Sequence, residues 1–333
     1  MSKICLIGGA GFIGTHLARK LMDDGHTVAI VDSLMVNNAR GPEELSPLHR
    51  SILATRQDVL RRADFTMADA RDYDVLSEIV GWFRPEVIVH LAAVAHQDRA
   101  QRSPRTTWGH SLRTLENALD IAAHVKAKRF VYFSSSTVYG AWPESGIVDE
   151  DTPCNPVHVY GSLKLAGELT TRSVCLAHGI EHQIVRPSAL YGPGCISGRV
   201  IQRFIENALD GKPLAIRKDD RLDFTHVRDL VAGVALAMFS PLANRTYNLT
   251  FGEGRLVSEA ASLVARQIPA KLTFANDLDQ FPPRGTLSIE RARKELGYSP
   301  EWPLERGIED YVNFYRELAH DEARSGDGKV GVS

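Results

Sequence analysis

Short apolar runs alternate with amphipathic stretches along the first part of the chain. The apolar runs resemble strands that are buried on both faces of a parallel sheet, and the stretches between them have helical periodicity. Alternation of strand and helix implies right-handed crossovers between strands of a single sheet. We therefore predict an α/β fold with a doubly wound parallel sheet. The predicted strands are 4–7, 27–31, 65–68, 87–93, 129–133 and 183–186, and the clearest helices are 73–83, 104–125 and 160–178.

The pattern changes after residue 186, where residues 187–194 are rich in the helix and strand breakers Pro and Gly. Shorter elements follow, and residues 33–63 are too polar and irregular for any element to be predicted. We expect two domains and a tail: residues 1–186, residues 187–318 as a smaller α/β substrate domain partly interleaved with the first, and residues 319–333 as a disordered tail. The shorter elements are predicted at 200–209, 214–216 and 227–238.

Composition and charge narrow the possible partners. The 333 residues include 39 Lys and Arg against 41 Asp and Glu, a net charge of −2, which does not favour nucleic acid or an anionic membrane surface as a partner. No apolar run approaches membrane-spanning length, and the N-terminus lacks a signal peptide. The four cysteines are scattered without a C-x-x-C pair, which predicts reduced thiols and no metal site. We expect a soluble cytoplasmic protein.

Glycines follow the first strand in the sequence Gly8-Gly9-Ala10-Gly11-Phe12-Ile13-Gly14, directly before a helical pattern. Gly8 or Gly9 allows a tight turn, Gly11 lets the backbone approach a pyrophosphate, and Gly14 lets the helix pack closely on the strand. The N-terminus of that helix then offers free N–H groups and its positive dipole end to the phosphates. This context predicts a dinucleotide-binding domain of the Rossmann type over residues 1–186.

A carboxylate at the end of the second strand indicates which dinucleotide is bound. Asp32 stands 18 residues after Gly14, where its oxygens can accept hydrogen bonds from the adenosine ribose hydroxyls. The same charge would repel a 2′-phosphate, which favours NAD over NADP. Asp69, after the third strand, could cap the adenine amino group or be a solvated turn residue, and the small side chains of Ala92 and Ala93 would leave room for the cofactor.

Tyr160 and Lys164 are four residues apart on a predicted helix, which places both on one helical face. A free tyrosine has a pKa of about 10, and a lysine beside the oxygen favours the phenolate. Tyr160 could then act as a base. Hydroxyl side chains gather at residues 134–137, directly after a strand, where open α/β sheets bind ligands.

Together these features resemble the extended short-chain dehydrogenases/reductases called the NAD-dependent epimerase/dehydratase family, typified by UDP-galactose 4-epimerase. The resemblance implies that Ser135 is the catalytic hydroxyl, Tyr160 the general base and Lys164 its partner and a ligand of the nicotinamide ribose. It also implies NAD as cofactor, a nucleotide-sugar substrate and a homodimer built through the helices 104–125 and 157–178. The implied cofactor-binding residues are Gly8, Gly11, Phe12, Ile13, Gly14, Asp32, Asp69, Ala70, Leu91, Ala92, Ala93, Tyr160 and Lys164.

The chain departs from the family pattern around the substrate. The 4,6-dehydratases carry Asp and Glu where this chain has Ser136 and Thr137, and neither hydroxyl can protonate a leaving group as a carboxylic acid does. Ala189 replaces an Asn that contacts the diphosphate in many relatives, and Leu222 replaces an Arg. Arg221 and Arg284 could supply that contact instead, or they could be solvated surface charges. We therefore expect Ser136, Thr137, Arg221 and Arg284 at the substrate.

The first functional hypothesis is an NAD-dependent nucleotide-sugar epimerase that passes through a keto-sugar intermediate, a 4-epimerase of a UDP-hexose or UDP-hexuronate. The alternatives within enzymes are a nucleotide-sugar dehydratase and a 4-keto reductase. An alternative of another class is a non-catalytic NAD-binding regulatory protein. The presence of Ser135, Tyr160 and Lys164 argues against this last alternative.

Overall fold

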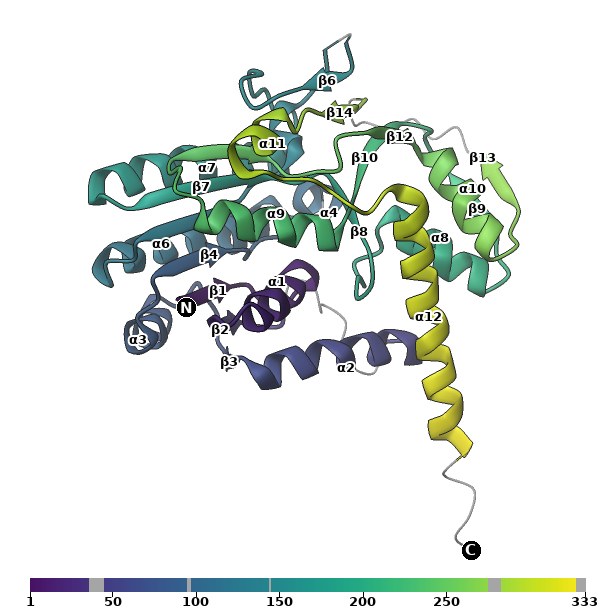
Figure 1. The fold of residues 1–333 in the computed structure, drawn as a ribbon, viewed down its shortest axis with the longest axis horizontal. Helices are drawn as coiled ribbons and strands as arrows, with labels where there is room; N and C mark the ends of the chain where they lie inside the picture. The colour runs from purple at the N-terminus through teal and green to yellow at the C-terminus, as the bar shows by residue number, and fades with distance from the viewer. Residues whose placement is uncertain (36–44, 95–96, 144, 275–282, 328–333) are drawn as a thin grey trace, which may run out of the picture.

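Seven parallel strands form the central sheet of the protein (Figure 1). The computed structural model describes residues 1–35, 45–94, 97–143, 145–274 and 283–327, except for the side chains of 97–99 and 321–327. The strand order is β11-β7-β5-β4-β1-β2-β3, so the order reverses between β1 and β4. The predicted Rossmann-type doubly wound sheet is confirmed. Its strands are β1 (Lys3–Ile7), β2 (Thr27–Asp32), β3 (Asp64–Met67), β4 (Val87–His90), β5 (Arg129–Phe133), β7 (Glu181–Arg186) and β11 (Arg245–Asn248).

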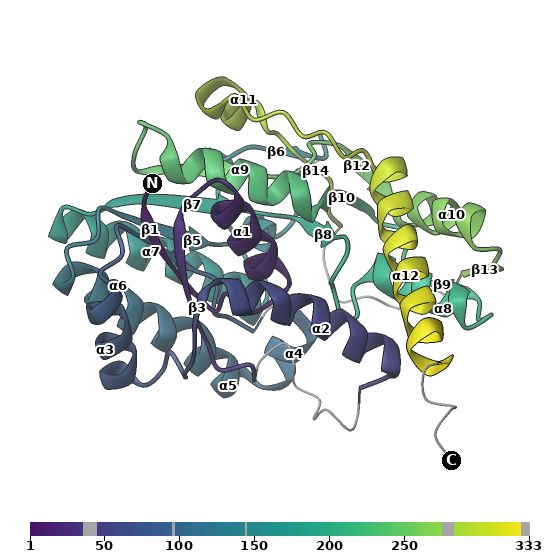
Figure 2. The same ribbon diagram turned by 60° about the horizontal axis from the view of Figure 1, so that its bottom comes forward.

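Helices cover both faces of this sheet (Figures 1 and 2). Ile4 and Leu6 of β1 belong to the core on one face, whereas Cys5 and Ile7 belong to the core on the other, because successive side chains of a strand point to opposite sides. The first face is covered by α1 (Phe12–Asp23), α2 (Pro47–Arg62) and α9 (Val227–Phe239), and the second by α3 (Tyr73–Phe83), α6 (Thr114–His124) and α7 (Val159–His178).

Helix α2 lies in the segment for which no element was predicted. The hydroxyl of Ser46 caps it by accepting the His49 N–H at 3.2 Å, and a proline occupies its first turn. Its buried positions are Ile52, Arg56 and Val59, an apolar stripe interrupted by an arginine. A stripe this narrow on an otherwise polar helix gives little periodicity, which explains why the sequence pattern did not reveal it.

The predicted helix 104–125 is divided into three pieces, α5 (Pro104–Trp108), the π-helical turn η2 (Gly109–Arg113) and α6. The hydroxyl of Thr114 donates to the carbonyl of His110 at 3.0 Å across this turn. Both residues line a cavity beside the carboxyl ends of β1 and β2. Single π-helical turns are frequent at functional sites. The π-helical turn η2 faces the cavity beside β1 and β2.

The second half of the chain forms smaller sheets to one side of the central one (Figure 1). The predicted elements 200–209 and 214–216 are confirmed as α8 (Val200–Leu209) and β9 (Leu214–Ile216). Although both come from this half, β11 joins the central sheet and α9 covers one of its faces, while the domain boundary at 186 and the interleaving of the two domains stay predictions. The other elements are α4 (Gln97–Arg102), η3 (Ser136–Tyr139), β6 (Ile147–Val148), β8 (Ala189–Tyr191), β10 (Arg221–His226), β12 (Gly254–Leu256), α10 (Val257–Gln267), β13 (Leu272–Phe274), β14 (Thr286–Leu287), α11 (Glu290–Leu296) and α12 (Leu304–Asp327).

The C-terminal helix is longer than the sequence indicated. Residues 319–327, which were expected in a disordered tail, continue α12, and residues 328–333 lie outside the described part of the chain. Across the described ranges, no helix combines the length and the apolar character needed to cross a membrane.

Candidate active site

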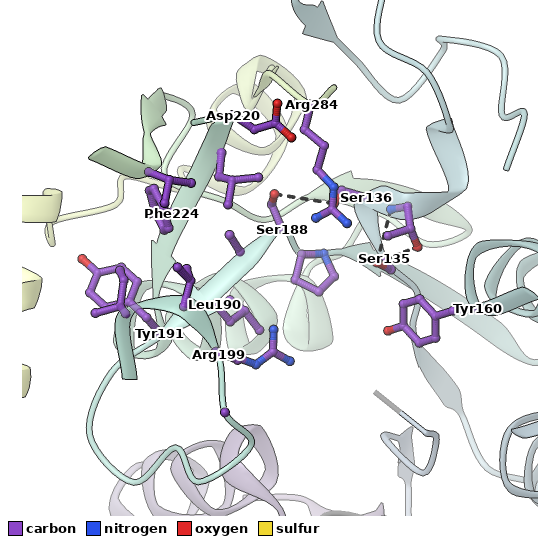
Figure 3. A pocket seen from close by; sticks show the side chains of 18 of the residues that line it. Ser135, Ser136, Tyr160, Ser188, Leu190, Tyr191, Arg199, Asp220, Phe224 and Arg284 are labelled. Atoms are coloured by element: carbon purple, nitrogen blue, oxygen red, sulfur yellow. Dashed lines mark hydrogen bonds between the residues drawn. The ribbon is translucent and has the colours of Figure 1, made fainter. Parts of the chain in front are cut away.

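A large cavity opens at the carboxyl end of β5, between the central sheet and the smaller sheets (Figure 3). Its volume is about 750 Å³. Ser135 and Tyr160 lie on one side of it, and Tyr191 and Phe224 lie across from them. Among the residues predicted from the sequence, Ile13, Leu91, Ala93, Ser135, Ser136, Thr137, Tyr160, Lys164 and Arg284 line this cavity.

Lys164 is buried beneath the cavity and is held by the backbone of β5. Its Nζ donates to the carbonyl of Phe133 at 2.6 Å and lies 5.9 Å from the centroid of the Tyr160 ring. Burial lowers the pKa of Lys164 to about 8, because the interior disfavours the ammonium, and the charge of Glu168 acts in the opposite direction. A lysine in this state can both carry charge and release it near neutral pH.

The pKa of Tyr160 is raised above its ordinary value of 10, because burial disfavours the phenolate. The Arg199 guanidinium, the Ser135 hydroxyl and the charge of Arg284 act against this effect. The sequence suggested that Lys164 makes the phenol more acidic. In the structure, burial outweighs the neighbouring groups, so the free protein holds Tyr160 as a phenol at neutral pH.

Hydroxyl groups line the cavity wall directly after β5. Ser135 caps the short helix η3, and its Oγ accepts the backbone N–H of Thr137 at 3.2 Å and the hydroxyl of Thr137 at 3.0 Å. The hydroxyl of Ser136 donates to that of Ser188 at 3.5 Å (Figure 3). These bonds fix the direction of each hydroxyl, so Ser135 can present its own proton to a ligand oxygen beside Tyr160.

A second, smaller cavity lies at the switch point of the sheet and shares Leu91 and Ala93 with the first. Ser33, His110 and Thr114 also line it and were not predicted, since a ligand role for them depends on the π-helical turn and on the loop after β2. Eight predicted cofactor residues line it: Gly8, Gly11, Asp32, Asp69, Ala70, Leu91, Ala92 and Ala93.

The glycine loop fits a dinucleotide. Gly8 has a φ of +82°, and a Cβ there would lie 2.4 Å from the amide nitrogen of Ala92. A Cβ at Gly14 would lie 2.3 Å from the carbonyl oxygen of Gly9, so only glycine lets α1 pack this closely. Helix α1 begins at Phe12 without a side-chain cap, which leaves its first N–H groups for a pyrophosphate. The ring of Phe12 itself lies in the core, whereas Ile13 reaches the large cavity.

Two carboxylates face the smaller cavity, and they differ in their hydrogen-bond partners and in the direction of their pKa shifts. Asp32 accepts the N–H of Ala10 at 2.9 Å and that of Leu34 at 2.8 Å, and burial raises its pKa. Each of its oxygens keeps a lone pair for a ribose hydroxyl. Asp69 instead accepts three bonds from the side chain of Arg71, which lower its pKa. Its oxygens are therefore engaged within their own loop.

The predicted substrate arginines separate in the structure. Arg284 lines the large cavity, but Arg221 lies outside it and donates to the carbonyl of Gly254 at 2.9 Å. Leu222, the next residue of β10, faces the cavity. The sequence reading missed four cations of this cavity. They are Arg199, Arg203, Arg217 and Lys218. Arg217 and Lys218 directly follow a predicted strand and could have been found from that position.

The sequence model of the NAD dependent epimerase/dehydratase family matches residues 4–250. The chain belongs to this family. The family is NAD-dependent, so NAD is the cofactor.

Similar proteins from this family span nearly the whole chain. An uncharacterized UDP-glucose epimerase of Bacillus subtilis, YtcB, is 28% identical and covers 96% of this chain and 100% of its own. A dTDP-glucose 4,6-dehydratase of Streptomyces niveus is 26% identical and covers 99% of both chains. The crystal structure of UDP-glucuronic acid 4-epimerase from Bacillus cereus, in complex with UDP-glucuronic acid and NAD, superposes with a TM-score of 0.84 at 25% identity, over 95% of this chain and 99% of that one.

The position of Asp32 predicts a strong preference for NAD. We expect NADP to bind about a hundredfold more weakly, because a like charge at close range costs several kcal/mol and each 1.4 kcal/mol is about tenfold in affinity. Asp32→Ser should narrow this ratio at least about tenfold. Calorimetric titration of both dinucleotides would measure it, with Asp64→Asn, at the far end of β3, as the control that changes neither affinity. Equal binding of NADP by the unchanged protein would remove Asp32 from this role.

Proposed function

We propose that this protein is a nucleotide-sugar epimerase that uses NAD and passes through a transient keto sugar, a 4-epimerase of a UDP-hexose or UDP-hexuronate. The observation that carries the proposal is that Ser135, Tyr160 and Lys164 line one cavity, which shares Leu91 and Ala93 with the smaller cavity. The relatives named as UDP-glucose epimerase and UDP-glucuronic acid 4-epimerase support the same reaction.

The chain's own residues have distinct roles in this proposal. Tyr160 takes the proton of the sugar hydroxyl as the carbonyl forms, and the Ser135 hydroxyl donates a hydrogen bond to the developing ketone oxygen. Lys164 holds its charge beneath the phenol and favours the phenolate when the substrate is bound. Gly11, Gly14 and Asp32 hold the cofactor. When bound, NAD supplies the hydride acceptor and a positive charge beside the phenol.

Cationic side chains in the large cavity bind the substrate's diphosphate in this proposal. Arg203, Arg217 and Lys218 line it together with Arg284, and Figure 3 shows the guanidinium of Arg284 directed into its centre. Since Ala189 and Leu222 cannot bind phosphate through their side chains, we assign the diphosphate to this group of cations. Arg221, which lies outside the cavity, is not part of it.

Arg199 favours a hexuronate over a hexose. Its guanidinium lies close enough to Tyr160 that its charge lowers the pKa of the phenol, and Figure 3 shows it inside the cavity. Its Nε is buried and makes no hydrogen bond within the described part of the chain. The carboxylate of a hexuronate is attached to ring carbon C5, next to the reacting C4 hydroxyl, and would meet this charge there.

A dehydratase is the alternative within the family, and the Streptomyces niveus relative carries that name. Elimination of water from the sugar needs an acid to protonate the leaving hydroxyl. Ser136 and Thr137 occupy the positions where the 4,6-dehydratases have acids. Asp220 is the one carboxylate that lines the cavity among the residues the structure describes, and it pairs with Lys218 at 2.8 Å. The side chains at the cavity therefore favour epimerisation.

We also propose that the protein is a cytosolic homodimer. Helix α7 leaves Leu169 and Leu176 54% and 82% exposed, and Trp108 of α5 is 60% exposed, although all three are apolar. A second copy would cover these side chains through the helices predicted from the resemblance. In the cytosol the four cysteines, which are free, would remain reduced.

Incubation with UDP-, GDP-, CDP- and dTDP-sugars in D₂O would test the proposed reaction. An epimerase of this type returns the hydride that it removed, so no hydrogen on carbon exchanges with solvent. We expect UDP-glucuronate to yield a C4 epimer of unchanged mass once exchangeable hydrogens are washed out, and faster than UDP-glucose does. A product lighter by one water, or one with deuterium at C5 or C6, would refute 4-epimerisation and indicate a dehydratase or, for C5 exchange alone, a 5-epimerase.

A further inference from the structure

Helix α7 carries three ionisable side chains at four-residue intervals, Tyr160, Lys164 and Glu168. This spacing places them along one face of the helix, which lies against the carboxyl end of β5. The roles proposed above use the first two. Glu168, the third, is fully buried although it carries a carboxylate. A buried carboxylate one turn from the reaction site requires an explanation, because burial of a charge is costly unless it is paired.

These side chains bond the two residues that precede Ser135 at the end of β5. Lys164 donates to the carbonyl of Phe133 at 2.6 Å. Glu168 accepts the hydroxyl proton of Ser134 at 2.6 Å. The next residue is Ser135, whose hydroxyl lowers the pKa of Tyr160. The segment that carries the proposed catalytic hydroxyl is therefore attached to α7 on both of its preceding residues.

Two arginines complete the surroundings of Glu168. Arg186, at the end of β7, donates to both of its oxygens, from Nε at 2.8 Å and from a terminal nitrogen at 2.7 Å. Arg172 donates a further hydrogen bond to Glu168 at 3.2 Å. The bidentate pair fixes the orientation of the carboxylate, so the oxygen that faces Ser134 has little freedom to move.

We propose that Glu168 is a positioning residue for the reaction at Tyr160 and Lys164. It holds Ser134, the residue before Ser135, against α7, and it is the buried counter-charge of Lys164. The inference rests on the proposed function, because it assigns Glu168 to the support of those two residues.

The charge around Lys164 gives this proposal a measurable signature. The groups that face its Nζ are the Tyr132 ring on β5 at 5.2 Å, the Tyr160 ring at 5.9 Å, His90 on β4 and Glu168. Glu168 is the one that raises the pKa of Lys164, against the lowering by burial to about 8. Without this charge the pKa of Lys164 falls further, and the ammonium is lost at a lower pH.

Glu168→Gln is the direct test, since it removes the charge and keeps the shape. Activity that requires the Lys164 ammonium declines as pH rises through its pKa. We expect the alkaline limb of the kcat/KM profile to move to lower pH by at least about half a unit, and kcat at pH 8 to fall at least about twofold, because the protonated fraction of Lys164 falls by that factor. The pH dependence of NAD binding, followed by calorimetry without substrate, should move in the same direction.

Two further variants keep the test decisive if Glu168→Gln fails to fold. Ser134→Ala removes the hydroxyl and leaves the ion pair, so kcat should fall about threefold to tenfold with the alkaline limb in place. Glu181→Gln is the matched control: it also removes a carboxylate paired with an arginine, Arg129, but at the amino end of β7, where its side chain is 48% exposed. It should change neither kcat nor the profile.

The outcomes separate this inference from the proposed function. A folded Glu168→Gln protein with an unmoved alkaline limb would overturn the counter-charge role, and a Ser134→Ala protein with kcat within twofold of the parent would overturn the positioning role. Both measurements start from an active parent enzyme. If the parent lacked epimerase activity, or if Tyr160→Phe kept it, the proposed function itself would fail whatever Glu168 does.

Discussion

Tyr160→Phe is expected to lower kcat about a thousandfold while NAD affinity and the melting temperature stay close to those of the parent. The change removes one phenolic oxygen from a side chain whose ring remains in place at the cavity wall. A thousandfold lies within the contribution of roughly 10² to 10⁴ that a positioned general base supplies. Steady-state kinetics with UDP-glucuronate and calorimetry with NAD would measure both parts.

The same assignment predicts how the parent enzyme responds to pH. Because burial raises the pKa of Tyr160, the phenol predominates at neutral pH and kcat/KM should rise with pH from 6 to 8. Tyr73→Phe is the matched control. It removes a phenolic oxygen that donates to Asp120 on the surface, so kcat should not change. A Tyr160→Phe protein that kept more than a tenth of the parent's kcat would show that another group acts as the base.

Six of the seven strands of the central sheet were predictable, because most of them are apolar runs between polar segments. The seventh, β11 (Arg245–Asn248), was not predicted, because polar residues interrupt its pattern. The bounds of these six strands in the structure differ from the predicted ones by up to three residues, since the strand predicted at 87–93 ends at His90. The helices were less uniform. Helix α7 was recognised, whereas α2 was missed because an arginine interrupts its two apolar contacts, Ile52 and Val59. Periodicity detects an element only in proportion to the apolar surface that it buries.

The site residues show a similar division between those that the pattern predicts and those that it does not. Residues attached to the end of a predicted strand, such as Asp32 and Ser135, lie at the cavities where the pattern placed them. Arg221 does not lie at the cavity. Neighbouring residues of a strand point to opposite sides, and the next residue, Leu222, faces the cavity. Nothing in the residue pattern of this strand distinguishes the face toward the cavity from the opposite face. Arg199 reaches the cavity from the loop before α8, and no spacing rule predicts such a path.

Glu168 shows a different limit of sequence reading. Its position four residues after Lys164 is visible in the sequence, but a glutamate at that spacing on a helix normally faces solvent. Its burial depends on Arg186, which arrives from the end of β7 and closes a bidentate pair across the helix. The carboxylate acquires its place only when strand and helix meet in the fold. Contacts of this kind, between segments that the sequence separates, had to be observed.

Gly14→Ala is expected to have the second large effect, on stability and on NAD binding together. The added Cβ would lie 2.3 Å from the carbonyl oxygen of Gly9 and 2.5 Å from its Cα, so the backbone of the glycine loop or of α1 must move. Overpacking of this kind costs about 1–3 kcal/mol of unfolding free energy. The displaced helix N-terminus should also raise the Kd for NAD at least about tenfold, since its N–H groups no longer face the pyrophosphate.

Gly81→Ala, in the last turn of α3, provides the contrast. A Cβ there meets nothing within 4 Å, and alanine is the better helix former, so this variant should gain about 0.4–1 kcal/mol of stability and leave NAD affinity unchanged. Chemical denaturation and calorimetry on both proteins would separate a local steric effect from a general loss of glycine flexibility. A Gly14→Ala protein with the parent's NAD affinity would mean that the close approach of α1 to the glycine loop is not what holds the cofactor.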